Sequence, residues 1–407
     1  MTKMRKEYRH IALLLSSMLM LLCTACGSSD GDSDDNNPPK EHQLQINIFT
    51  PEHPVVTRTG ELVNSNADEN VNTMDLWVFV SEATQHFNVG KVVGHLSLDI
   101  ADPSSFVGGV YQMSVSEDFA NELPKVNVYV TANVKPSNTG ITLTAGSSEA
   151  DFGTATLSGA YFGLTSLTTA PPTEGLPMSG LLKNQTINDE STPLLKVGDP
   201  VENPVKVVRA VSKVRFIFSR TDTGETDELH INSISLAGNM IPTEEYLFLE
   251  NPTDRYRTSN TYIEDVKVLA SGLESTTIPT STYPARYAYD SNNANQKKGQ
   301  DYEDEIDKGL KGHYSGETYT EGTPELVELG RYYLRESNKQ LQGTINYTIG
   351  TGEPKTAPFM MYEGDNFTRN HTWIVYGYFT GKETLKVSCV NVTDWDQSTT
   401  SHPVYNW

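Results

Sequence analysis

The segment QLQINIF, residues 43–49, alternates polar and aliphatic side chains without interruption. Successive side chains of a β-strand point to opposite faces, so this alternation predicts a half-buried strand. Leu44, Ile46 and Ile48 are its expected core-facing residues. The sequence PEHP, residues 51–54, ends the pattern, because proline cannot continue a hydrogen-bonded ladder.

The same period of two recurs along the rest of the chain. Every second residue is apolar in 126–130, 214–218, 345–349 and 385–389. In residues 76–80 the aromatic Trp77 and Phe79 lie between Leu76, Val78 and Val80, and residues 372–379 form another strand-like apolar segment. No long segment shows the helical period of 3.6 residues. Strands without regular helices between them predict an all-β protein built from sandwiches, in place of a parallel α/β sheet.

The chain divides into segments of different composition. We expect a β-sandwich over residues 59–222 and a second over residues 223–407, separated near the charged, flexible stretch 221–227. Residues 290–311, rich in Asn, Asp, Lys and Gly, are expected to form a long surface loop.

The net charge restricts the classes of partner. The 407 residues include 52 Asp or Glu and 31 Lys or Arg, which gives a formal net charge of -21. Nucleic acids and anionic lipid headgroups are bound by clustered basic residues, so this balance argues against both as partners.

The first 25 residues have the pattern of a signal peptide. Four basic residues lie in residues 1–10, an almost purely apolar run covers residues 11–22, and Ala25 precedes Cys26. The apolar run is shorter than the roughly 20 residues of a membrane-spanning helix. Of the three cysteines, Cys23 would leave with the signal peptide and Cys389 is expected to be a small buried apolar residue, so no intrachain disulfide is predicted between folded parts.

No signature of an enzyme, metal site or cofactor site is present. The nine histidines are scattered, and neither a metal-binding spacing nor a glycine-rich phosphate loop occurs. His371, in the sequence RNHT of residues 369–372, is expected to satisfy local backbone groups at a strand edge. Carboxylates are too abundant for a glycosidase-like pair to be recognised by number alone.

Arg58 lies in VVTRTG, residues 55–60, a polar and turn-like setting after the first predicted strand. An accessible arginine there is a candidate for trypsin-like cleavage between Arg58 and Thr59. The alternative interpretation is an ordinary arginine in a surface loop.

Two resemblances concern export. The order Leu22-Cys23-Thr24-Ala25-Cys26 resembles a bacterial lipobox, in which Cys26 becomes a lipidated N-terminus; the alternative is an ordinary secretory peptide cleaved nearby. The acidic tract of residues 26–35 resembles the tethers that direct Bacteroidetes lipoproteins to the outer face of the outer membrane.

The landmarks together resemble the FimA-type fimbrillins, which are subunits of Bacteroidetes type V pili. The residues that carry this resemblance are Cys26, VVTRTG (55–60), LWVFV (76–80), LPMSG (176–180), VRAVSKV (208–214), YYLRE (332–336), RNHT (369–372), Asp394-Trp395 and Trp407. They occur in family order over nearly the whole chain. Arg335 departs from the pattern, because a plainer residue is expected there, and the last dozen residues do not match a stalk subunit well.

The resemblance implies two transthyretin-like β-sandwiches and assembly by strand exchange. In such a process the lipoprotein export machinery delivers the precursor, and an arginine-specific protease cuts the Arg58–Thr59 bond. Residues 26–58, the tether and the removable strand with Leu44, Ile46 and Ile48, then leave. A strand from another pilin subunit fills the groove, and the expected donor segment here contains Val404, Tyr405 and Trp407.

The implied function is a non-enzymatic structural subunit of a cell-surface fimbria that supports adhesion to a host or bacterial surface receptor. The lipidated precursor would reside in the outer membrane before it joins the fimbria. A tip or anchor subunit of the same fimbria is the first alternative. A surface lipoprotein that binds glycans through exposed aromatic residues is the second, since the chain has 20 tyrosines and 4 tryptophans.

Overall fold

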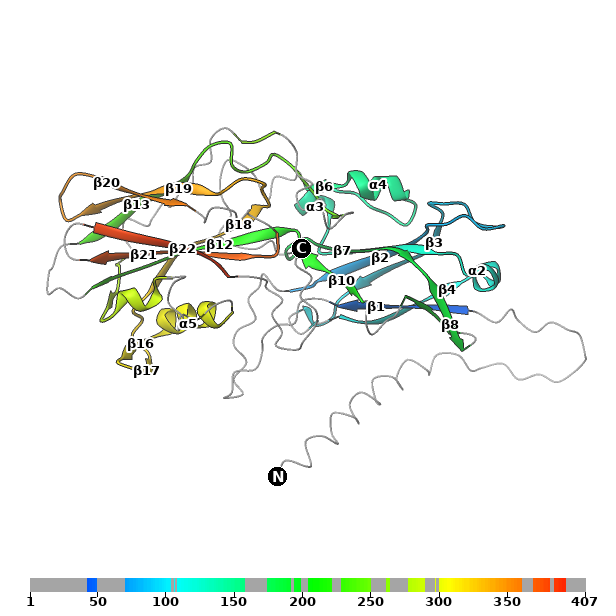
Figure 1. The fold of residues 1–407 in the computed structure, drawn as a ribbon, viewed down its shortest axis with the longest axis horizontal. Coiled ribbons are helices and arrows are strands. Elements are labelled where there is room, and N and C mark those ends of the chain that lie inside the picture. The colour runs from blue at the N-terminus through cyan, green and yellow to red at the C-terminus, as the bar shows by residue number, and fades with distance from the viewer. Residues whose placement is uncertain are drawn as a thin grey trace, which may run out of the picture. The chain divides into compact units, whose positions relative to one another are not determined.

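The computed structural model describes residues 42–49, 70–103, 106, 108–157, 174–191, 194–198, 204–221, 228–249, 261–263, 277–289, 297, 300–360, 369–380 and 384–392. Strands dominate these residues, which confirms the predicted all-β class (Figure 1). Among the helices of this part of the chain, none is long and apolar enough to cross a bilayer.

Two five-stranded sheets form the N-terminal half of the fold. The first contains β1 (His42–Phe49), β4 (Gly108–Val115), β8 (Ile187–Ser191), β9 (Leu194–Val197) and β10 (Val205–Lys206). The second contains β2 (Thr73–Val80), β3 (Val92–Asp99), β5 (Val126–Ala132), β7 (Met178–Gln185) and β11 (Val208–Arg209). Both sheets contribute to one apolar core, in which Leu44 and Leu195 of the first sheet meet Leu76 and Val128 of the second. The arrangement is that of a β-sandwich.

The second sheet is apolar on both faces. Leu76 and Val78 of β2 point into the sandwich core, whereas Trp77 and Phe79 pack on the outer face against Phe152. Three short elements lie in this region of the chain: α3 (Pro136–Thr139), α4 (Glu149–Thr154) and β6 (Thr156–Leu157). A strand buried on both faces explains why residues 76–80 are uniformly apolar.

The C-terminal half has a second pair of sheets. One contains β12 (Val211–Thr221), β15 (Thr280–Ser281), β18 (Val327–Arg335), β21 (Thr372–Thr380) and β22 (Thr384–Val392). The other contains β13 (Leu229–Leu236), β19 (Gln342–Ile349) and β20 (Lys355–Met360). Phe216, Ile234, Ile345 and Trp373 lie in the core that they share.

The strand β12 pairs with strands far along the chain. It runs antiparallel to β18 and parallel to β21, so it belongs to a sheet whose other members follow residue 279. The predicted division after residue 222 would group this strand with the N-terminal sandwich. The position of the division stays a prediction.

The expectation of a loop over residues 290–311 is wrong for its C-terminal half. Residues 300–311 form the helix α5 (Gln300–Lys311), which precedes the hairpin of β16 (Gly312–Ser315) and β17 (Thr318–Glu321) (Figure 1). Tyr302 and Ile306, four residues apart, pack with Ile217 and Ile374 of the sheet that contains β12. The helix has few apolar residues and many charged ones, so its helical period is not evident in the sequence.

The remaining short elements are α2 (Glu117–Glu122), β14 (Glu245–Tyr246) and the 3-10 helix η6 (Pro284–Tyr287). The Ser116 side chain caps α2 by accepting a hydrogen bond from the Phe119 amide at 3.3 Å. The strand β14 pairs with β6, which lies nearly 90 residues earlier in the chain.

Candidate functional site

The strand β1 is an internal strand of the first sheet. On one side it pairs antiparallel with β4 over its whole length, from His42 opposite Val115 to Phe49 opposite Gly108. On the other side it runs parallel to β9 and then to β10. We call the position of β1 between these strands the β1 slot.

The predicted core-facing residues of β1 do face the core. Leu44, Ile46 and Ile48 are 0%, 1% and 4% exposed, while Gln43, Gln45 and Asn47 between them are half-buried. Burial of a large aliphatic side chain contributes up to about 1.5–3 kcal/mol. The slot would therefore be apolar and costly to leave empty.

The slot is lined by residues that the sequence interpretation did not identify. On β4, Met113 lies opposite Leu44, Tyr111 opposite Ile46 and Gly109 opposite Ile48. The parallel neighbours are Leu195 beside Leu44 and Val205 beside Ile48. The only signal for β4 in the sequence is the weak alternation VYQMSV of residues 110–115.

Tyr111 presents an aromatic wall to the slot. It is half-buried, and burial raises the pKa of its hydroxyl group to about 12. The phenol therefore stays neutral and adds no charge to the slot at physiological pH.

The connection between β1 and the rest of the fold is residues 50–69, which contain Arg58 and Thr59. Both residues lie outside the described part of the chain, as do Cys26 and the C-terminal Val404, Tyr405 and Trp407. Their roles in lipidation, processing and strand donation stay predictions.

The motifs YYLRE and RNHT supply a buried polar cluster away from the slot. Arg369 donates hydrogen bonds to the carbonyl oxygens of Tyr246 and Leu247, at 2.5 and 2.8 Å, and forms an ion pair with Glu336. The Glu336 amide donates to Glu245 Oε2 at 2.7 Å. The motif residues therefore fix the segment that contains β14.

Arg335, where the sequence analysis expects a plainer residue, belongs to the same cluster. It is almost fully buried, and its Nη1 atom donates a hydrogen bond to the Thr243 carbonyl oxygen at 2.6 Å. Its long polar side chain therefore secures the backbone that leads into β14.

The surroundings of His371 and Cys389 fit a structural role for both residues and not a catalytic one. His371 Nδ1 lies 2.7 Å from the Arg369 carbonyl oxygen, and the His371 carbonyl accepts a hydrogen bond from the Lys213 amide at 2.9 Å. These backbone contacts agree with the expected structural role. Cys389 is half-buried against the core, less than the full burial expected from the sequence. Burial raises the pKa of its thiol to about 12, which disfavours the nucleophilic thiolate. Within the described residues, no group of three or more His, Cys, Asp or Glu could hold a metal ion.

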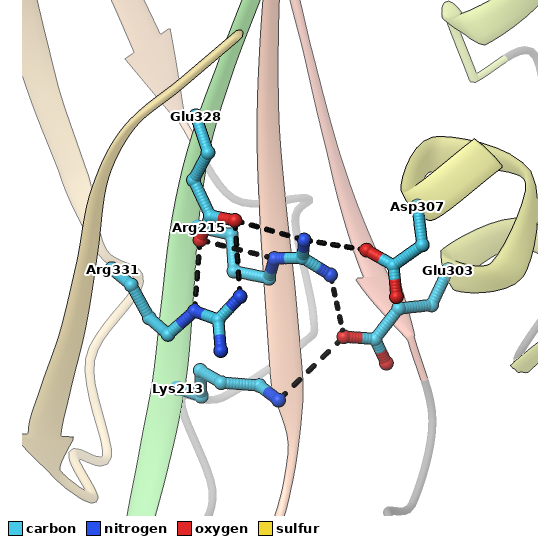
Figure 2. A network of polar contacts seen from close by, with 6 residues as sticks. All are labelled: Lys213, Arg215, Glu303, Asp307, Glu328 and Arg331. Atoms are coloured by element: carbon cyan, nitrogen blue, oxygen red, sulfur yellow. Dashed lines mark hydrogen bonds and ion pairs between the residues drawn. The ribbon is translucent and has the colours of Figure 1, made fainter. Parts of the chain in front are cut away.

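A second polar network fastens α5 to the sheet beneath it (Figure 2). Arg215 of β12 contacts Glu303 and Asp307 of α5 and Glu328 of β18, at 2.9, 2.7 and 2.9 Å. Lys213 Nζ lies 3.6 Å from Glu303, and Arg331 contacts Glu328 at 2.9 Å.

Electrostatics in this network favour the ionised forms. Burial disfavours the charge of Arg215, but Asp307, Glu328 and Glu303 outweigh it and raise the arginine pKa well above its ordinary value. For Glu328, burial is outweighed by Arg215 and Arg331, which lower its pKa to about 2. The side chains neutralise one another, so the network is a structural fastening.

Comparison with known proteins gives structural likeness at low identity. No model of a known protein family matches the sequence, and no curated protein matches it. A putative cell adhesion protein from Bacteroides eggerthii DSM 20697 is 12% identical, with 88% of this chain and 97% of that chain covered and a TM-score of 0.46. The tip fimbrial protein Mfa3 from Porphyromonas gingivalis, with a C-terminal truncation, is 14% identical, with 86% and 99% covered and a TM-score of 0.46. The fimbrial anchor protein Mfa2 from the same organism is 8% identical, with 86% and 97% covered and a TM-score of 0.34.

Proposed function

We propose that this protein is a structural subunit of a cell-surface fimbria, in which β1 is removed and a strand from another subunit takes its place. The observation that carries the proposal is the placement of β1. It is paired on both sides within a sheet, yet it is joined to the rest of the fold only through residues 50–69. One cut after Arg58 would leave β1 held by noncovalent contacts alone.

Loss of β1 would leave a position in the sheet that is stable only when another strand fills it. The edge of β4 and the edges of β9 and β10 would lose their backbone partners, and an apolar groove would open where Leu44, Ile46 and Ile48 had been. Unpaired strand edges bind other strands readily. A strand from a second subunit restores the main-chain hydrogen bonds and fills the groove with alternate side chains.

The same proposal assigns a protective role to β1 before cleavage. While β1 occupies the slot, the precursor exposes no open edge there, so export as a Cys26-lipidated protein would proceed without premature polymerisation. The arginine-specific protease then acts as the trigger at the cell surface.

The test is a cleavage and assembly experiment on the purified precursor, residues 26–407. Treatment with an arginine-specific protease should give one new N-terminus at Thr59, followed by a ladder of oligomers on gels and fibres in electron micrographs. The matched control is Arg58→Gln, which should remain uncleaved and monomeric. Cleavage at Arg58 without release of β1 or oligomer formation would contradict the proposal, as would resistance of Arg58 in a folded precursor.

The same preparation separates the positions within a fibre. Deletion of residues 394–407 removes the expected donor segment. A stalk subunit so shortened should accept a strand but fail to extend the fibre, whereas a tip subunit should cap fibres as the full chain does. An anchor subunit should resist cleavage and retain β1 and its lipid.

A further inference from the structure

The core face of the β1 slot consists of three unequal subsites. The Leu44 subsite lies between Met113 of β4 and Leu195 of β9, and the Ile46 subsite lies beside Tyr111. The Ile48 subsite lies beside Gly109, which has no side chain to form a wall. Neighbouring side chains on one face of paired strands are about 4.5–5.5 Å apart at Cβ, so these residues limit what each subsite can hold.

Met113 is accommodated by a glycine in the opposing sheet. A Cβ atom at Gly94 of β3 would lie only 2.1 Å from Met113 Sδ. The Met113 side chain therefore reaches from the first sheet across the core to the backbone of the second, and it is only 8% exposed. Only glycine at residue 94 leaves room for the sulfur in this position.

Methionine and tyrosine form walls of different kinds. Methionine is unbranched and has three rotatable side-chain bonds, so it adapts to neighbours of different size. Tyr111 is rigid, and a Cβ atom at Gly109 would lie 3.6 Å from its hydroxyl oxygen, which places the ring along the space that Gly109 leaves. The Leu44 subsite thus has an adaptable wall, and the Ile46 subsite has a fixed one.

We propose that Met113, with Gly94 beneath its sulfur, is the specificity-determining residue of the β1 slot and makes the Leu44 subsite tolerant of Leu, Met or Phe. The inference rests on the proposed function and describes the partner: a strand that runs antiparallel to β4. This strand carries a β-branched aliphatic residue in the Ile46 subsite and a variable large apolar residue in the Leu44 subsite.

The first test uses the intact precursor and requires no strand release. The test variants are Leu44→Phe, Met113→Ala and the double variant that combines them. The matched controls are Ile46→Phe and the double variant that combines Ile46→Phe with Met113→Ala. Leu44→Phe should lower the urea midpoint less than Ile46→Phe does. Met113→Ala should recover at least half of the Leu44→Phe loss and none of the Ile46→Phe loss. If Met113→Ala recovers the urea midpoint equally in Leu44→Phe and Ile46→Phe, or recovers it in neither, the proposed role of Met113 is wrong.

A complementary variant acts from the opposing sheet. Gly94→Ala should displace the Met113 sulfur toward the Leu44 subsite and lower the midpoint, and Leu44→Val should restore part of that loss by making room. If Gly94→Ala and Leu44→Val lower the midpoint additively, Met113 does not couple the two positions and the proposal fails.

The second test measures strand selection in the cleaved protein. Fluorescent peptides of sequence 42–49, with Leu, Phe or Ala in the Leu44 subsite or Phe in the Ile46 subsite, are titrated by anisotropy. Phe should be accepted in the Leu44 subsite with less than about tenfold loss of affinity, whereas Phe in the Ile46 subsite should lose about tenfold or more. Met113→Val, a stiffer wall, should widen the preference for Leu over Phe.

The two tests separate failure of this inference from failure of the proposed function. If no peptide binds the cleaved protein, strand replacement is wrong, while the unfolding data still decide whether Met113 sets the subsite. If all peptides bind and Met113→Val weakens every peptide equally, the strand slot is real and the specificity role is wrong.

Discussion

Glu245 is fully buried at the start of β14, beside two arginines and a second carboxylate. Its Oε2 atom accepts a hydrogen bond from the Glu336 amide, and Oε1 has no hydrogen-bond partner among the described residues. Burial raises the pKa of Glu245 to about 8; Arg369 opposes this shift, Glu336 adds to it and Arg335 opposes it. The folded protein therefore binds a proton on Glu245 that the unfolded chain releases at neutral pH.

This proton makes stability depend on pH. The unfolded carboxyl group has a pKa near 4.5, so the stabilising contribution is full below pH 4.5 and is lost as pH rises toward 8. The glutamine of Glu245→Gln cannot ionise. The free energy of unfolding of this variant, measured relative to that of the wild type, should therefore increase by roughly 1 kcal/mol for each pH unit as pH rises across this window. Urea unfolding at pH 5, 6, 7 and 8 measures the difference, and parallel pH curves for the two proteins would refute the assignment.

At the scale of an element, α5 depends on one arginine. Arg215 is 2% exposed and holds Glu303 and Asp307 of the helix together with Glu328 of β18 (Figure 2). Arg215→Met should lower the free energy of unfolding by about 3–5 kcal/mol, because it removes the buried cation that lies between Glu303 and Glu328 and leaves them only Lys213 and Arg331 as partners. Amide exchange in α5 should accelerate more than exchange in β19.

The matched control for this prediction is Lys308→Ala, an exposed residue of the same helix. Its effect on the free energy of unfolding should stay within about 0.5 kcal/mol. If Arg215→Met leaves exchange in α5 unchanged, the other contacts of the helix, among them the packing of Tyr302 and Ile306 and the Lys213–Glu303 pair, are enough to hold it.

The elements differ in how well the sequence predicts them. The period-two pattern of β1 is local and strong, so its strand state and its buried face are both predictable. The helix α5 escaped prediction because its apolar residues are few and Gly309 interrupts it. That glycine is explained only by the fold, since a Cβ atom there would lie 2.6 Å from a methyl carbon of Leu326.

The residues that line the β1 slot could not be predicted from the sequence, for a different reason. The pairing of β1 with β9 and β10 joins residues about 150 positions apart. Such parallel contacts leave no local periodicity, and a single sequence does not specify which strands become neighbours. The contact between Met113 and Gly94 joins two different sheets, so neither residue could be assigned a role before the packing of the sheets was known.

At the scale of the whole molecule, residues 245–248 tie the C-terminal half of the chain to the N-terminal half. The Leu247 amide donates to the Ala155 carbonyl at 2.8 Å, and the Ser179 hydroxyl donates to the Leu247 carbonyl at 2.5 Å. Phe248 packs against Tyr129 and Phe152, with ring centroids 5.2 and 5.5 Å apart. We therefore expect both halves to unfold in one cooperative transition.

Phe248→Ala tests this coupling. Removal of a buried phenylalanine costs about 3–5 kcal/mol, and here the loss falls on the contact between the halves and leaves the core of each sandwich intact. Native-state hydrogen exchange along a urea series should show one shared midpoint for β5 and β19 in the wild type and two separate midpoints in Phe248→Ala. Met360→Ala, at a residue 54% exposed on β20, should keep the shared midpoint. A common downward shift of β5 and β19 in Phe248→Ala would mean that the remaining contacts, such as the Asn370 side chain with the Arg209 amide, suffice to couple the halves.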